Sequence, residues 1–175
     1  MAAPAAGVRR LSVLEHISSF HTLAQIGVAL AGFAGLAAAM GVSSEKSVAV
    51  FARLRGVVLN GLLLAVGAMV PILIDGFDLP YDLIWRIAAG VLLVLNWLGL
   101  LIGMRMYGAE TTLSLVDKAF VIPLEVSVQL LLLTVILGIF SSHGEILIVT
   151  FLVLVLLQGI AMFLSFFDQV FYPSE

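Results

Sequence analysis

Long stretches without a charged residue constrain this chain more than any other feature of its sequence. Four of them are about 20 residues long, the length at which a helix rising 1.5 Å per residue crosses a hydrocarbon core of ~30 Å. A fifth, longer stretch between Glu15 and Glu45 holds the first expected span. The four shorter runs, each bordered by charged residues, are 56–74, 87–104, 126–144 and 146–167. This spacing predicts five transmembrane helices.

Composition supports an all-α, polytopic integral membrane protein without a soluble catalytic domain. Hydrophobic residues make up 62% of the 175 positions and charged residues 11%, whereas soluble domains average about 45–50% and about 25%. The predicted organisation is an N-terminal tail and interfacial segment (1–19), a transmembrane domain (20–168) and a short C-terminal tail (169–175). The expected spans are about 20–41, 50–74, 84–105, 121–140 and 145–168.

Several function classes are excluded by what the sequence lacks. It has no cysteine, so disulfides, thiolate metal sites and a cysteine nucleophile are excluded. Its net charge is −3, without a basic run, which argues against nucleic acid as a partner. It contains no zinc-protease, serine-hydrolase or nucleotide-binding motif. We therefore expect neither an enzyme nor a bound cofactor.

The first apolar segment has its small residues on one helical face. Gly27, Ala31, Gly35 and Ala39 recur at every fourth position, and such a face lets two transmembrane helices approach closely. We therefore expect this helix at the centre of the bundle. An alternative interpretation is a cleaved signal peptide, because Arg9 and Arg10 precede the apolar run. Glu15 and the length of the run argue against cleavage.

The third span carries a similar face. Asn96, Gly99 and Gly103 lie on one side of the expected helix, which predicts that this side meets the small-residue face of the first helix. The stretch 94–103 also resembles 58–67. Whether that similarity is an inverted repeat or chance stays open.

Four amide side chains fall inside the expected spans. An unpaired amide in hydrocarbon is costly, so these residues should face protein or water. They could line a path for an ion or small solute, or they could form hydrogen bonds between helices. The four residues are Asn60, Asn96, Gln129 and Gln158.

Three charged residues are expected near one mouth of the bundle, on the side opposite the N-terminus. Either Arg53 or Arg55 could pair with Glu125 and form a gate, or all three could be ordinary interface charges. With Glu125 at that edge, no carboxylate lies within a span. A bundle of this kind would have little means of coupling transport to protons.

The histidines are expected on the N-terminal side, which we call side A; the opposite side is side B. His16 and His21 are five positions apart, which does not place both on one helix face. With His143 they could bind a metal or sense pH, but surface histidines are the simpler interpretation. We expect no metal site.

Side B carries more basic residues than side A. The positive-inside rule then places the N-terminus outside and the C-terminus in the cytoplasm, and the composition suggests a bacterial inner membrane.

The sequence leaves two functional classes. One is a homo-oligomeric ion channel or passive pore; the other is a structural or accessory subunit of a larger membrane complex. The expected partners are membrane lipid and either further copies of the chain or other membrane proteins.

Overall fold

The computed structural model describes residues 6–41, 48–77, 79–107, 122–139 and 143–171. Over these ranges the chain forms five helices and no strand, which confirms the prediction of an all-α bundle. In chain order the helices are α1 (Ala6–Gly41), α2 (Val48–Asp75), α3 (Tyr81–Tyr107), α4 (Ile122–Ile136) and α5 (Gly144–Phe171).

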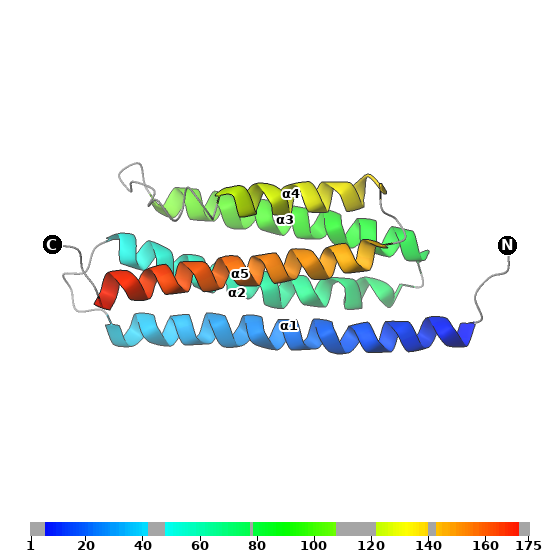
Figure 1. The fold of residues 1–175 in the computed structure, drawn as a ribbon, viewed down its shortest axis with the longest axis horizontal. Helices are drawn as coiled ribbons and strands as arrows, with labels where there is room; N and C mark the ends of the chain where they lie inside the picture. The colour runs from blue at the N-terminus through cyan, green and yellow to red at the C-terminus, as the bar shows by residue number, and fades with distance from the viewer. Residues whose placement is uncertain (1–5, 42–47, 78, 108–121, 140–142, 172–175) are drawn as a thin grey trace.

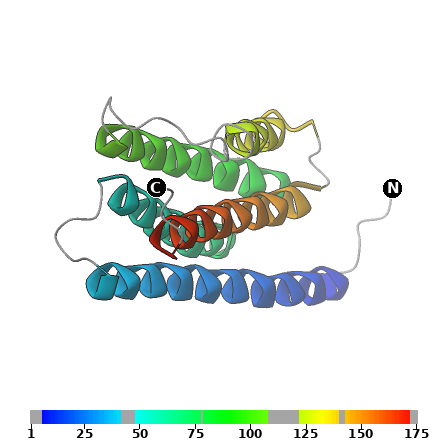
Figure 2. The same ribbon diagram turned by 60° about the vertical axis from the view of Figure 1, so that its left-hand side comes forward.

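The helices lie side by side in three layers (Figures 1 and 2). α1 forms one outer layer, α2 and α5 form the middle, and α3 and α4 form the other outer layer. The expectation that the first helix is central is wrong. α2 is the helix that packs against α1, α3 and α5. The reason is that α1 has a small-residue face on one side only, while bulky residues such as Val28 and Phe33 are exposed on the others.

Four of the helices are long and apolar enough to cross a membrane, as expected of an integral membrane protein. The four apolar segments are Ile17–Ala37, Leu54–Asp75, Tyr81–Gly103 and Gly144–Phe166. α4 is different. Its 15 residues extend only about 22 Å at 1.5 Å per residue, and α4 begins well inside the length of the bundle (Figure 1). The expected fourth span of about 121–140 thus agrees with the start of α4 but not with its end, because the helix stops at Ile136.

α4 ends in a glycine turn. Gly138 has a φ of 70°, and the Ile139 N–H donates to the Thr134 carbonyl at 3.1 Å, as in a helix C-cap. The guanidinium of Arg86 lies against Gly138, where a Cβ would overlap it. A cation at the end of a helix interacts favourably with the helix dipole, so Arg86 helps to hold the side A end of α4.

α1 and α2 are joined by direct contact between their backbones. A Cβ on Gly27 would lie 2.6 Å from the Gly61 carbonyl oxygen, and a Cβ on Gly61 would lie 2.7 Å from the Gly27 carbonyl oxygen. Ala31 lies at the same crossing, and its Cβ is 3.0 Å from the place where a Cβ on Gly61 would lie. Close approach of this kind brings more atoms into van der Waals contact, which is what drives helix association in lipid.

The main apolar core lies between α2, α3, α4 and α5, and α1 adds Phe20 and Leu23 to it. Gly67 leaves room for Leu92 and Leu152, which meet over it from α3 and α5. Other fully buried members of this core are Leu64, Leu132, Ile148 and Phe151. A smaller core of Ala34, Leu54, Val57 and Phe166 joins α1, α2 and α5 toward side B.

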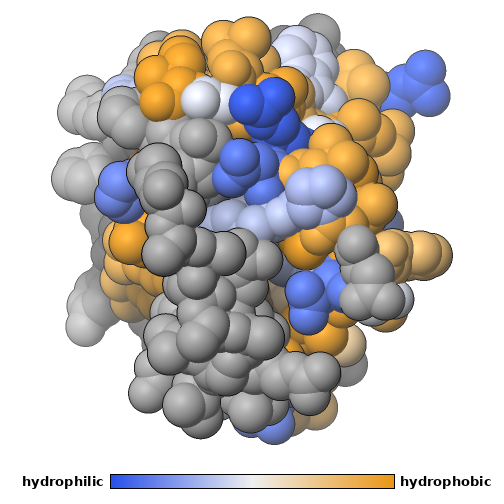
Figure 3. All heavy atoms as spheres, turned by 90° about the vertical axis from the view of Figure 1, so that its right-hand side faces the viewer, coloured by the Kyte–Doolittle hydropathy of each residue, from blue (hydrophilic) through white to orange (hydrophobic). Residues whose placement is uncertain are grey.

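The sides and the ends of the bundle have different surfaces. Large apolar residues, including Leu73, Leu130 and Leu164, are exposed along the helices, as expected of helices in contact with lipid. Hydrophilic residues gather on the side A end, which Figure 3 faces. Among the exposed residues at this end are Asp75, Asp82, Arg86 and His143.

We predict that Gly27→Ala destabilises the bundle. The new Cβ would overlap backbone atoms of α2, which cannot rotate away, and overpacking of this kind costs about 1–3 kcal/mol. This exceeds the helix-propensity gain of about 0.8–1 kcal/mol from replacing glycine. The measurement is the unfolding temperature in detergent.

The matched control is Gly32→Ala on the same helix. No described atom lies within 4 Å of a Cβ at that position, so this variant should be as stable as the parent or slightly more stable. Equal loss of stability in both variants would contradict the proposed contact.

Candidate functional site

A single carboxylate joins α3, α4 and α5. Asn96 Nδ2 donates to Glu125 Oε1 at 2.6 Å, and Gln129 Nε2 donates to the same oxygen at 2.8 Å. Gln158 Nε2 donates to Glu125 Oε2 at 3.3 Å. These four residues are called the Glu125 cluster below. Three of them, Asn96, Gln129 and Gln158, are residues that the sequence marked as candidate polar lining.

The Glu125 cluster lies deep in the bundle. Asn96 is near the middle of the span Tyr81–Gly103, and Gln158 is near the middle of the span Gly144–Phe166. Glu125 reaches both because α4 begins inside the bundle. The expectation that Glu125 lies at the side B edge, with no carboxylate within the membrane, is therefore wrong.

The fold compensates the charge of Glu125 in two ways. Glu125 is in the first turn of α4, where the positive end of the helix dipole favours a negative side chain. The three amide groups supply hydrogen bonds to an ionised acceptor, which are stronger than bonds between neutral groups. Asn96 and Gln158 are only 5% and 7% exposed, so these donors are themselves withdrawn from lipid and water.

The cluster extends toward the outer face of α3. Trp97 Nε1 donates to Gln129 Oε1 at 3.1 Å, which satisfies the oxygen of that amide. Trp97 is 55% exposed, while Glu125 and Gln129 are partly exposed. The site is therefore buried on the α5 side and shallower on the side that Trp97 covers.

Asn60, the fourth candidate lining residue, lies on the other side of α5. Its Nδ2 donates to Met162 Sδ at 3.5 Å, a weak acceptor. Gly159, which follows Gln158 on α5, lies next to Asn60. A Cβ at Gly159 would lie 3.5 Å from Asn60 Cβ and 2.9 Å from Leu30 Cδ2. Asn60 is thus close to the Glu125 cluster in depth but has a different hydrogen-bond partner.

The small residues that were expected to form helix contacts lie in different surroundings. Gly27 and Ala31 lie at the crossing with α2, whereas no described atom lies within 4 Å of a Cβ at Gly35, Gly99 or Gly103. The side chain of Ala39 lies outside the described residues. The expectation that Asn96, Gly99 and Gly103 meet α1 is wrong, because Asn96 turns toward the carboxylate on α4.

The expected arginine–glutamate pair is not formed by Arg55. Arg55 is exposed, and Glu125 bonds instead to the three amides. The side chain of Arg53 lies outside the described residues. His21 and His143 are both exposed, and the side chain of His16 is likewise not described. Over the described ranges no group of three His, Cys, Asp or Glu is close enough to hold a metal ion.

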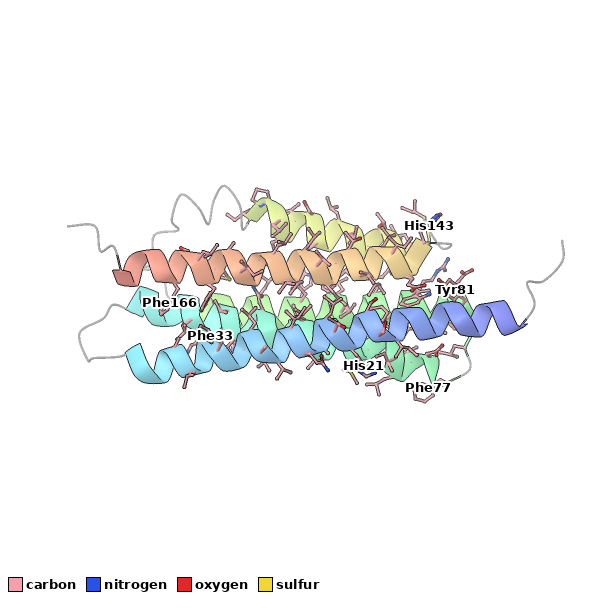
Figure 4. The ribbon with its side chains drawn as sticks, turned by 60° about the horizontal axis from the view of Figure 1, so that its bottom comes forward. His21, Phe33, Phe77, Tyr81, His143 and Phe166 are labelled. Carbon is pink, nitrogen blue, oxygen red and sulfur yellow. The ribbon has the colours of Figure 1, made fainter. Side chains whose placement is uncertain are left out.

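A second polar contact, which the sequence did not suggest, joins α3 and α5 at side A. Tyr81 donates its hydroxyl to Glu145 Oε2 at 3.1 Å. The ring of Trp85 lies 5.8 Å from that of Tyr81 and 6.2 Å from that of Phe20. Figure 4 shows Tyr81 and His143 at this end and Phe33 and Phe166 toward the other. Tyr and Trp at a bundle end are typical of residues at the membrane interface.

Comparisons with protein-family models, curated proteins and solved structures gave no match. The function is therefore argued from the geometry of the chain itself. The Glu125 cluster is the feature that carries this argument, because an ionisable residue within the membrane is by default a functional candidate.

We predict that Asn96 and Glu125 are energetically coupled. In a double-mutant cycle with Asn96→Leu and Glu125→Leu, the coupling energy should be about 1–2 kcal/mol, above the average of ~0.6 kcal/mol for interhelical hydrogen bonds, because the acceptor is charged. The free energy of unfolding of the parent, the two single variants and the double variant is measured in detergent with an increasing fraction of denaturant.

The control is a second double-mutant cycle, which combines Asn60→Leu, in place of Asn96→Leu, with Glu125→Leu. Asn60 bonds to Met162 rather than to Glu125, so its coupling with Glu125→Leu should stay within about 0.5 kcal/mol. Equal coupling in the two cycles would show that the hydrogen bonds to the carboxylate are not the source.

Proposed function

We propose that this chain is a homo-oligomeric membrane channel that conducts small cations by way of Glu125. The observation that supports this is a carboxylate held at the middle depth of the bundle by three neutral amides. A negative group with neutral partners attracts cations and repels anions. The three amides would line the path next to it.

The alternative for the Glu125 cluster is a purely structural role, and the magnitudes argue against it. A charged residue at the centre of a transmembrane helix costs about 2.5–3.5 kcal/mol on insertion scales. Each interhelical hydrogen bond contributes ~0.6–2 kcal/mol, so the three bonds to Glu125 roughly offset that cost. Gln at position 125 could bond to the same neighbours without that cost. The carboxylate therefore favours a function that needs a charge.

The same proposal includes the orientation of the protein and the membrane in which it lies. The larger number of basic residues on side B supports a cytoplasmic side B and an outside N-terminus. The protein would then lie in a bacterial inner membrane, in contact with lipid and with further copies of itself.

A second candidate function is supported by a separate observation. Gly99 and Gly103 on α3, and Gly32 and Gly35 on α1, have open space where a side chain would extend among the described residues. Gly99 and Gly103 are four positions apart, a spacing typical of contacts between transmembrane helices. These faces support a structural or accessory subunit that docks onto other membrane proteins.

We predict that Glu125→Gln abolishes cation flux while the protein still folds. The amide keeps the size of the side chain and can still meet its neighbours, but it carries no charge. Flux is measured in liposomes containing the purified protein, with proton-, sodium- and potassium-sensitive dyes. Asp75→Asn is the control, because Asp75 is an exposed carboxylate at the end of α2 and should conduct like the parent. Flux that survives Glu125→Gln would sink the channel proposal.

The two candidate functions predict different responses to Gly99→Leu. In a complex that docks through α3, this bulky side chain should remove the partner from the purified material, while the monomer stays folded because the position is open. Native mass spectrometry of the protein extracted with its partners measures this. Retention of every partner would argue against docking through this face, and a closed homo-oligomer in the parent would support the channel.

A further inference from the structure

We infer that the ion is a proton, that it binds to Glu125 Oε2, and that Gln158 turns its amide to accept it. This rests on the proposed function and specifies its substrate. The two carboxylate oxygens have unequal environments. Oε1 accepts two short hydrogen bonds, at 2.6 and 2.8 Å, whereas Oε2 accepts one from Gln158 at 3.3 Å.

Oε2 is the oxygen with room for a proton. Two close amide donors already occupy the lone pairs of Oε1, so a proton there would displace a hydrogen bond from Asn96 or Gln129. The bond to Oε2 lies at the long end of the normal range for N–H···O. A proton on Oε2 therefore costs the weakest of the three interactions.

Gln158 is the residue that can respond to the proton. Its side-chain amide has a donor nitrogen and an acceptor oxygen at nearly the same positions after a half-turn. Toward a carboxylate it presents N–H, as observed; toward a carboxyl O–H it would present its oxygen. Because Gln158 is only 7% exposed, water does not readily replace Glu125 as its partner, so the orientation of the amide follows the proton.

The cluster suits a proton better than a metal cation. Hard divalent cations take about six to eight oxygen ligands. Any metal ion that loses its water needs several oxygen ligands in place of that water. Here the amides of Asn96 and Gln129 present N–H groups, not oxygens, to the carboxylate. Trp97 further fixes Gln129 by bonding to its oxygen. A proton needs only one acceptor besides Oε2, and Gln158 supplies it.

Proton uptake and release at Glu125 Oε2 form a closed cycle. Hydronium that reaches Glu125 from one side of the membrane transfers a proton to a lone pair of Oε2, which leaves water and a neutral carboxyl group. The new O–H then donates to the Gln158 carbonyl. On release, the O–H bond breaks with its electron pair remaining on Oε2, and the proton passes to water on the other side. Gln158 returns to donating its N–H.

The other described titratable groups on the helices that pack against α4 lie toward the ends of those helices. On α3, Arg86 lies at Gly138 at the far end of α4, and Arg105 is exposed near the side B end. On α5, Glu145 bonds to Tyr81 near side A. In the described part of α3, α4 and α5, the groups bonded to Glu125 are amides, so a pH-dependent signal from the middle of the bundle reports Glu125.

The first test is ion selectivity in liposomes that contain the parent protein. The current or dye signal should reverse at the potential set by the pH gradient, and exchanging sodium for potassium should not move it. A reversal potential set by sodium or potassium, with flux still lost in Glu125→Gln, would overturn the proton assignment and leave the channel proposal standing. Absence of all flux would overturn the channel proposal itself.

The second test reads proton binding without flux. Infrared difference spectroscopy between acid and alkaline pH should show a protonated-carboxyl band that disappears in Glu125→Gln. In Gln158→Leu the band should move to higher frequency, because the O–H has lost its acceptor, and proton flux should fall about tenfold, the size of one lost hydrogen bond. Asn60→Leu, which removes an amide not bonded to Glu125, should leave the band in place. An unchanged band in Gln158→Leu would overturn the role of Gln158.

Discussion

A charge cannot remain within hydrocarbon unless the protein around it supplies hydrogen bonds, and this constraint determines how α3, α4 and α5 are placed. Glu125 takes one donor from each of those three helices, so a shift of any one along its axis would break a bond to the carboxylate. The short helix α4 depends on this most. It ends against Arg86 at side A and begins at the cluster, so its two ends are held by polar contacts of different kinds.

The other half of the bundle is held by apolar packing. α1 contacts α2 where Gly27 and Gly61 bring the two backbones together, with no polar side chain needed at the crossing. α2 belongs to both halves, since Gly67 on the same helix admits Leu92 and Leu152 from the core. The protein thus combines a rigid, apolar pair of helices with a polar centre in which hydrogen bonds can be rearranged.

Much of the fold could be predicted from the sequence, and the failure at α4 has a physical reason. Spacing between charges located α2, α3 and α5 because their charges lie at the helix ends, as at Asp75 and Arg105. The same reasoning placed Glu125 at a helix end, which is right, but it put that end at the edge of the bundle, whereas α4 begins inside it (Figure 1). A signal was present: Glu125 and Gln129 are four positions apart and share a helix face. Three mid-span amides also required an acceptor. The depth at which α4 begins was not encoded in any local pattern.

The position of Gln158 in the chain has a consequence for biosynthesis. The crossing of α1 and α2 involves neighbouring helices, so it can form as soon as the second of them leaves the ribosome and enters the bilayer. Glu125 follows much later, and its hydrogen-bond partner Gln158 belongs to α5, the last of the five described helices in chain order. Because chains fold from the N-terminus during synthesis, the hydrogen bonds to the carboxylate are completed later than the contact between α1 and α2. A ribosome that stalls before position 158 would leave a membrane-inserted chain whose central charge is still incompletely bonded.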